Sequence, residues 1–201
     1  GGKDAKPASQ ADKNFTELKT VQELFGAWQV SFDPKWGGPE RIAFDTLQDW
    51  TTRPEPGIKY YSGIATYRKT FNLARIPEGK TYLDVGVVHD MARVKLNGKD
   101  LGEVWCAPWR VEVTGAIKAG DNQLEIEVVN RWANRMIGDK QPADANARTV
   151  ECPPGFLGGK RIPAGRYTFC TDDAYDSNSP LLPSGLLGPV QIMTRFTGTS
   201  K

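Results

Sequence analysis

Three tryptophans lie outside the regular alternation of apolar and polar residues, in surroundings suited to binding a sugar. Trp36 lies in the stretch KWGGP, Trp105 follows a turn signal, and Trp132 has two arginines and an asparagine beside it. An indole ring packs against the apolar face of a pyranose, while guanidinium and amide groups hydrogen-bond to its hydroxyls. The predicted carbohydrate contacts are Trp105, Trp132, Arg135, Arg166, Trp36 and Asn134.

Packing in a hydrophobic core is the alternative explanation for such rings. Trp28 shares its parity with Val30 and Phe32, so we expect its ring inside the core. The same argument favours a buried Trp109, which precedes two valines of its own parity. Parity does not decide the orientation of Trp105, because that residue lies in a loop between two predicted strands.

Hydrolysis of a glycosidic bond needs two carboxyl groups at a set separation. Three glutamates alternate with apolar residues and are expected on solvent-facing sides of strands: Glu112, Glu125 and Glu127. A second group could bind a cation or a sugar hydroxyl, or be solvated: Asp172, Asp173 and Asp176. His89 has no G-x-S-x-G nucleophile to complete a triad. We therefore expect no catalytic residue in this chain.

The composition excludes several classes of partner. The 201 residues carry a net charge of +2, which supplies no basic field for nucleic acid. No apolar run reaches the length of a membrane span, about 18 residues. The single histidine and three cysteines without CxxC spacing argue against zinc, and Cys152 and Cys170 could be a disulfide or free thiols. We expect no cofactor, although a structural calcium ion is compatible with a sandwich fold.

Period-two alternation dominates the chain and predicts strands. It is clearest over residues 28–32, 83–87, 92–96, 111–113 and 124–128, and residues 188–193 return to the same pattern. Asn97-Gly98 predicts a tight hairpin, because a primed turn needs positive φ at both central residues. Helical spacing occurs only over Phe15–Phe25, where we expect one short helix. Many short strands with little helix predict an all-β fold, a two-sheet antiparallel jelly-roll sandwich.

The predicted domain has three parts. Residues 1–14 are polar and rich in small side chains, as in a disordered linker or tail. Residues 15–197 form a single sandwich, interrupted over 133–187 by a segment rich in Pro, Gly, Asp and Asn. A connection of that length is more often functional than incidental. We therefore expect a long irregular insertion before the last strand, carrying the surface that faces a partner.

Several stretches resemble the sugar-binding jelly-roll domain of glycoside hydrolase family 2. They include YYSGIATYRKTF, the Asn97-Gly98 hairpin, and a G-x-N-x-L strand that begins at Gly120. A wider resemblance is to the C-terminal β-sandwich of α-L-rhamnosidases of glycoside hydrolase family 106. It rests on FDPKWGGP, DW, NRWANRMIGD, AGRYTF and SPLLPSGLLGPV, which follow one another from Phe32 to Val190. The resemblance implies a galactose-binding-like sandwich in a secreted or periplasmic polysaccharide-degrading enzyme whose catalytic carboxylates lie in another domain.

Three functional interpretations follow. The leading one is a non-catalytic module of a rhamnosidase-like glycoside hydrolase, which contacts carbohydrate weakly, or buttresses a catalytic domain and contributes loops to its cleft. The second is a purely structural domain, which requires the rings of Trp36, Trp105 and Trp132 to be packed inside. The third is an independent hydrolase, which requires two loop carboxylates about 5 to 10 Å apart across one pocket.

Overall fold

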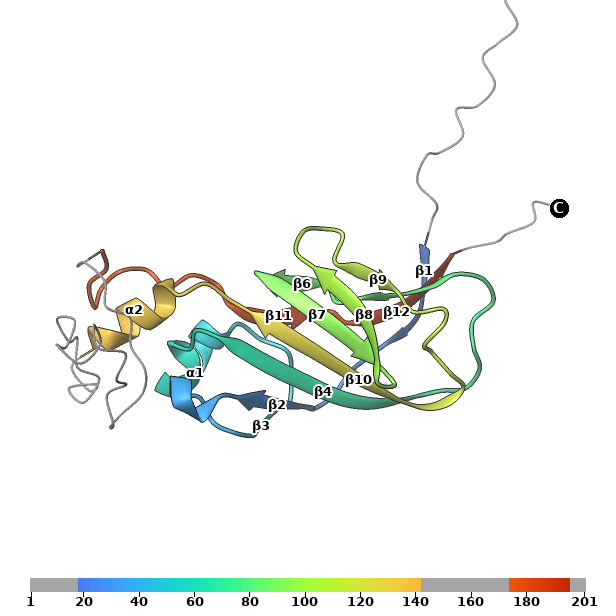
Figure 1. The fold of residues 1–201 in the computed structure, drawn as a ribbon, viewed down its shortest axis with the longest axis horizontal. Coiled ribbons are helices and arrows are strands. Elements are labelled where there is room, and N and C mark those ends of the chain that lie inside the picture. Colours follow the sequence, from blue (N-terminus) through green and yellow to red (C-terminus); the bar gives the residue numbers. More distant parts are fainter. Residues whose placement is uncertain (1–17, 142–173, 196–201) are drawn as a thin grey trace, which may run out of the picture.

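The computed structural model describes residues 18–141 and 174–195 and has two antiparallel sheets packed face to face (Figure 1). One sheet has six strands in the order β3-β2-β4-β10-β7-β8, and the other has four in the order β1-β12-β5-β9. A short pair, β11-β6, accompanies them. The strands are β1 (Leu18–Glu23), β2 (Trp28–Phe32), β3 (Ile42–Phe44), β4 (Ile64–Leu73), β5 (Thr81–Asp84), β6 (Val87–His89), β7 (Met91–Leu96), β8 (Lys99–Val104), β9 (Arg110–Glu112), β10 (Gly120–Val129), β11 (Gly185–Gly188) and β12 (Gln191–Arg195).

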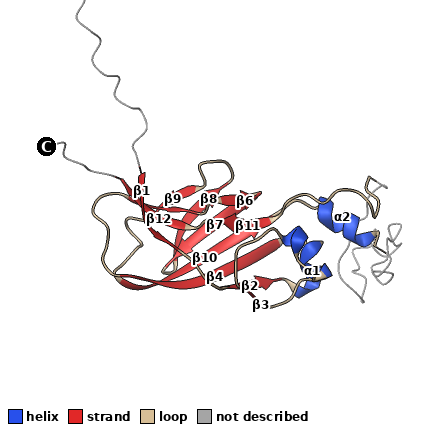
Figure 2. Ribbon diagram, turned by 180° about the vertical axis from the view of Figure 1, so that it is seen from behind, coloured by secondary structure: helices blue, strands red, loops and turns tan. Residues whose placement is uncertain are grey.

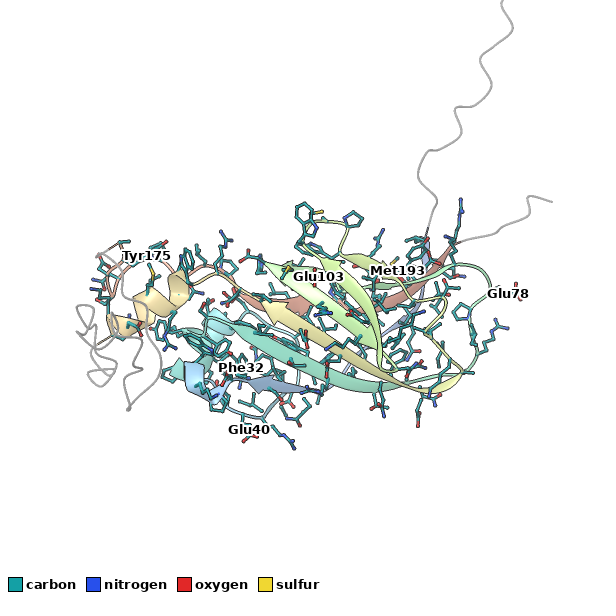
Figure 3. The ribbon with its side chains drawn as sticks, viewed as in Figure 1. Phe32, Glu40, Glu78, Glu103, Tyr175 and Met193 are labelled. Atoms are coloured by element: carbon teal, nitrogen blue, oxygen red, sulfur yellow. The ribbon has the colours of Figure 1, made fainter. Side chains whose placement is uncertain are left out.

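The helices gather at one end of the sandwich, as Figure 2 shows. They are the 3-10 turns η1 (Pro34–Trp36) and η2 (Trp50–Thr52) and the α-helices α1 (Pro56–Lys59) and α2 (Ala133–Asp139). We call this the helical end; β4 begins there and β10 ends there. In Figure 3, Phe32 lies toward the helical end and Glu78 at the opposite end. No helix among the described residues is long and apolar enough to cross a membrane.

The core lies between the sheets and is made by every second residue of each strand. Trp28, Val30 and Phe32 of β2 are buried, and the residues between them are not. The ten-residue strands β4 and β10 pair along their whole length and form the centre of the six-stranded sheet. The predicted all-β sandwich is therefore confirmed, including the inward ring of Trp28. The ring of Trp109 is half-buried against the same core.

The predicted hairpin joins β7 to β8. Asn97 has a φ of 53° and Gly98 a φ of 79°, so both central residues adopt the left-handed region that a primed turn requires. The Asn97 side chain also holds the neighbouring turn, since its Nδ2 donates to Ala116 O and to Asn122 Oδ1, each at 2.8 Å. Its Oδ1 accepts a bond from Gln123 N at 2.9 Å. One side chain thus ties the hairpin to the start of β10.

The predicted helix over Phe15–Phe25 is wrong, because the described part of that segment is the edge strand β1. It pairs with β12, and the register shifts between Thr20 and Gln22. The extra residue, Val21, breaks the alternation of inward and outward side chains. Apolar residues on the two sides of the irregularity then fall at spacings that resemble a helix.

The segment 133–187 is more regular than predicted. Its first residues form α2, and its last ones include β11, which pairs with β6 before β12 begins. Two strands, β11 and β12, therefore stand where the sequence predicted one strand after the insertion. Several sequence-predicted residues lie outside the described ranges, and nothing here tests them: Cys152, Arg166, Cys170, Asp172 and Asp173. The expected domain limits at residues 14 and 197 also fall outside the described residues and stay predictions.

Replacement of Asn97 by alanine should lower the free energy of unfolding by about 2–4 kcal/mol. The substitution removes three hydrogen bonds and places alanine at a positive φ. The matched control is Asn72→Ala, which removes one exposed bond to Asp121 and should cost no more than about 0.5 kcal/mol. Urea unfolding of both variants measures the difference. Equal losses would contradict the role assigned to Asn97.

Candidate functional site

A surface hollow of about 660 Å³ opens at the helical end, and we call it the Trp36–Trp132 hollow. Three separate segments form its walls. The first wall is the turn after β2, the second is the junction between α1 and β4, and the third is the residues that follow β10. Its lining residues are Asp33, Trp36, Tyr61, Ser62, Gly63, Ile64, Asn130, Arg131 and Trp132. The hollow brings together two of the tryptophans predicted from the sequence.

Asp33 sets the position of the first wall. Its Oδ1 accepts a bond from Lys35 N at 2.9 Å and so caps the 3-10 turn that presents Trp36. Gly37 ends this turn with a φ of 84°, a conformation that favours glycine. A capped and sharply ended turn holds the indole of Trp36 in one place, half-buried against the core.

The hydroxyl of Tyr61 joins the first wall to the second. It accepts a bond from Asp33 N at 3.1 Å and donates one to Ile64 O at 3.0 Å. The ring is 1% exposed and meets Phe32 edge to face, with centroids 4.8 Å apart. Burial is the main reason that the pKa of the Tyr61 phenol is raised above its ordinary value.

The amide of Asn130 joins the second wall to the third. Its Oδ1 accepts a bond from Gly63 N at 3.1 Å, and its Nδ2 donates to Tyr61 O at 2.9 Å and to Ser184 Oγ at 3.3 Å. Gly63 has a φ of 145°, and a Cβ there would lie 3.0 Å from the Tyr61 hydroxyl. The backbone at the start of β4 can therefore approach Tyr61 only as glycine.

The floor and rim of the hollow are largely apolar and open to solvent. The Ile64 residue is 54% exposed and Trp132 is 64% exposed, which is unusual for side chains of this size. Arg131 adds a guanidinium group, whose Nε lies 2.9 Å from Asp90 Oδ2. The hollow therefore offers apolar surface beside charged groups, which suits a ligand with one apolar face and several hydroxyls.

Arg135 and Asn134, which were predicted as sugar contacts, lie behind the hollow and are not among its lining residues. Their contact with sugar stays a prediction. Arg135 is 1% exposed; its Nη1 donates to Trp36 O, and its Nε lies 3.4 Å from Asp139 Oδ1. Asn134 is also buried and exchanges bonds with the backbone of Leu182, at 2.7 and 2.8 Å. Six of the seven residues of α2 are buried, these two among them. Their hydrogen bonds position Trp36 and the returning chain.

Trp105 is 73% exposed but is not part of this hollow. It follows Val104, which pairs with Ala92, so it lies at the level of the start of β4 along the sheet. Three strand spacings separate β8 from β4, a distance of about 14 Å. Arg166 lies outside the described residues. Of the six predicted contacts, the structure brings the rings of Trp36 and Trp132 into one hollow.

Sequence reasoning missed Asp33, Tyr61, Ile64 and Asn130 as parts of the site. Each lies in or beside a stretch that carried the family resemblance, but none has a spacing that signals chemistry by itself. Ile64 has the apolar type of a core residue, and only its outward parity in β4 could have identified it as exposed. Tyr61 and Asn130 act through backbone contacts that a linear sequence does not display.

The described lining of the Trp36–Trp132 hollow carries fewer carboxyl groups than glycoside hydrolysis uses. Among its described lining residues, Asp33 is the one that carries a carboxyl group, whereas the reaction uses two. Within the described ranges, no three His, Cys, Asp or Glu side chains gather where they could hold a metal ion. The apolar and charged groups of the described lining can bind and orient a ligand.

Comparisons with known proteins agree with the fold. The family described as "Glycosyl hydrolase 2 galactose-binding domain-like" matches residues 60–186. A Formosa agariphila protein named "Putative beta-glucuronidase" is 40% identical over 187 residues, which are 88% of this chain and 16% of that protein. A rhamnosidase structure from Novosphingobium sp. PP1Y has a TM-score of 0.74 and 36% identity, over 94% of this chain and 16% of that one. The chain thus spans only 16% of the length of each relative.

Replacement of Tyr61 by phenylalanine should lower the free energy of unfolding by about 1–3 kcal/mol, because the partly buried backbone N–H of Asp33 loses its acceptor. The matched control is Tyr82→Phe, since Tyr82 is half-buried on β5 and its hydroxyl bonds to no described residue. Denaturant unfolding of both variants tests the difference. A loss in Tyr61→Phe no larger than in the control would show that the hydroxyl does not hold the hollow.

The raised pKa of Tyr61 also predicts a dependence on alkaline pH. The unfolded chain releases the phenol proton near pH 10, whereas the folded chain retains it to higher pH. The stabilising contribution is therefore complete below pH 10 and is lost as the pH rises above it. Between pH 10 and 11, the free energy of unfolding should fall more steeply in the wild type than in Tyr61→Phe, by up to about 1.4 kcal/mol per pH unit. Identical slopes would contradict this assignment.

Proposed function

Because the chain belongs to the glycosyl hydrolase 2 galactose-binding domain-like family, we propose that it is a non-catalytic, carbohydrate-contacting module of a glycoside hydrolase. The observation that carries the proposal is the Trp36–Trp132 hollow, where two indoles and Ile64 provide apolar surface beside charged groups. Aromatic faces attract the apolar face of a sugar ring, and Asp33 and Arg131 are within the same lining to meet its hydroxyls.

We further propose that the parent enzyme is rhamnosidase-like and that this chain corresponds to the C-terminal sandwich of glycoside hydrolase family 106. The likeness to the Novosphingobium rhamnosidase over 94% of this chain supports the first part. The second rests on the order of the motifs from FDPKWGGP to SPLLPSGLLGPV. The Formosa relative makes glucuronides the alternative class of sugar.

The partner of such a module would be the catalytic domain of the same enzyme. The chain spans 16% of each relative, which leaves room in those proteins for a separate catalytic domain. In this proposal the sandwich contacts saccharide at its helical end and buttresses that domain. Degradation of polysaccharides outside the cell membrane, by a secreted or periplasmic enzyme, would be the setting.

The other two interpretations lack their required observations in the described residues. A purely structural domain needed all three rings inside, but Trp105 and Trp132 are 73% and 64% exposed. An independent hydrolase needed two carboxyl groups across one pocket, and the Trp36–Trp132 hollow has one in its described lining. Carbohydrate contact is therefore the function that the geometry supports best.

Replacement of Trp132 by alanine should raise the dissociation constant for rhamnose-containing oligosaccharides at least about tenfold, or ~1.4 kcal/mol, because it removes one aromatic wall of the hollow. Isothermal titration calorimetry measures the change. Trp105→Ala is the matched control, since it removes an equally large and exposed indole that lies outside the hollow.

Two results would contradict the proposal. In the first, neither rhamnose-containing nor glucuronide oligosaccharides bind the wild-type chain at millimolar concentration. In the second, Trp105→Ala weakens binding and Trp132→Ala does not, which would move the contact to the β8–β9 loop. Preferential binding of glucuronides would support the proposed site and change the proposed class of sugar.

A further inference from the structure

The outer face of the six-stranded sheet carries a straight row of side chains across five strands. Ala43 of β3 lies opposite Gln29 of β2, which lies opposite Arg68 of β4. Arg68 lies opposite Glu125 of β10, which lies opposite Lys95 of β7. These residues have outward parity, so the row faces away from the core.

A second hollow, of about 630 Å³, lies over this row, and we call it the sheet hollow. Its lining residues are Ala27, Trp28, Gln29, Ala43, Arg68, Lys69, Thr70, Lys95, Gly98, Gln123, Leu124 and Glu125. Apart from Ala43, the outward side chains of its strands are amides, a hydroxyl and charged groups. Such a surface can hydrogen-bond to many hydroxyls at once.

Arg68 is held in position before any ligand arrives. Its Nε donates to Glu125 Oε2 at 2.8 Å and its Nη1 donates to Ser31 Oγ at 3.2 Å. Within the described part of the chain, its Nη2 has no hydrogen-bond acceptor, and its side chain is 48% exposed. A donor fixed in this way loses little conformational entropy when it binds.

The charges along the row largely cancel. Glu125 accepts from Arg68 on one side and from Lys95 Nζ, at 3.2 Å, on the other, and Lys95 also reaches Glu127 at 2.8 Å. Lys69 has inward parity, and its Nζ bonds to the carbonyls of Gly26 and Ala27. The sheet hollow therefore suits a neutral, hydroxyl-rich ligand rather than a strongly anionic one.

Both hollows include outward-facing residues of β4. Ile64 lines the Trp36–Trp132 hollow and has the same outward parity in β4 as Arg68, which lines the sheet hollow. Four residues along a strand correspond to about 14 Å. Thr66 lies between them on the same face and opposite Glu127. A single extended molecule can therefore contact both hollows along β4.

We propose that the chain binds an extended neutral oligosaccharide, with one part in the Trp36–Trp132 hollow and another part in the sheet hollow. The inference rests on the proposed function for the first hollow and adds a second site and a minimum ligand length. The first hollow supplies apolar stacking, and the second supplies hydrogen bonds from Gln29, Arg68 and their neighbours. Affinity should then increase with chain length, since a short sugar reaches one hollow only.

The test is calorimetric titration of the full chain with L-rhamnose and with neutral rhamnose-containing oligosaccharides of increasing length. We expect the longer ligands to bind at least about tenfold more tightly than the monosaccharide. Arg68→Gln and Gln29→Ala should each remove most of this gain and leave monosaccharide binding unchanged. Trp132→Ala should weaken the binding of ligands of every length.

Arg93→Gln is the matched control. Arg93 is an ion-paired arginine on the same face, bonded to Asp100, and it lines neither hollow. It should leave every dissociation constant unchanged, and thermal unfolding verifies that all variants are folded. Gln29→Ala carries no change of charge, so it separates loss of a hydrogen bond from loss of the Arg68–Glu125 pair.

The outcomes separate the two proposals. If monosaccharide binding depends on Trp132 and does not strengthen with chain length, the sheet hollow is not a binding site and the first hollow still is. If the gain with length persists in both Arg68→Gln and Gln29→Ala, the second contact lies elsewhere and the inference is overturned. If no saccharide of any length binds, the proposed function itself fails.

Discussion

A buried hydroxyl, that of Tyr61, determines how the end of β2 meets the start of β4. It satisfies the partly buried backbone groups Asp33 N, after β2, and Ile64 O, at the start of β4. The Asn130 amide, at the end of β10, likewise bonds to backbone groups, Gly63 N and Tyr61 O. The wall positions of the Trp36–Trp132 hollow therefore follow from the need to satisfy backbone polar groups, and the rings are mounted on that framework.

Charged groups in this domain have two physical roles. On the outer face, Arg68, Glu125 and Lys95 form pairs that solvent screens, so they contribute little to stability and remain available for contact. Behind the hollow, the Arg135–Asp139 pair is almost fully buried, where a charge without a partner would be very costly. Because Arg135 also bonds to Trp36 O, the buried pair fixes α2 relative to η1.

Sequence periodicity was sufficient to predict the two-sheet architecture but not to predict which residues form the site. Alternation identified the strands and the inward ring of Trp28, and the Asn97-Gly98 turn followed from its need for positive φ. The β1 segment was mistaken for a helix because one extra residue disrupts the pairing with β12. Trp132 could be singled out because it ends the alternation of β10. Its neighbour Arg135 was placed in the site by proximity in sequence, whereas the structure buries it together with most of α2.

The edge pairing of β1 with β12 has a topological consequence. Leu18 and Arg195 are cross-strand partners, so the two ends of the described sandwich lie about 5 Å apart. They are at the opposite end from the helices, as Figure 1 shows. Ends this close allow the order of the segments to be permuted by a short linker, or the domain to be carried as an insert within another chain. Either rearrangement would leave the helical end and the outer face of the larger sheet where they are.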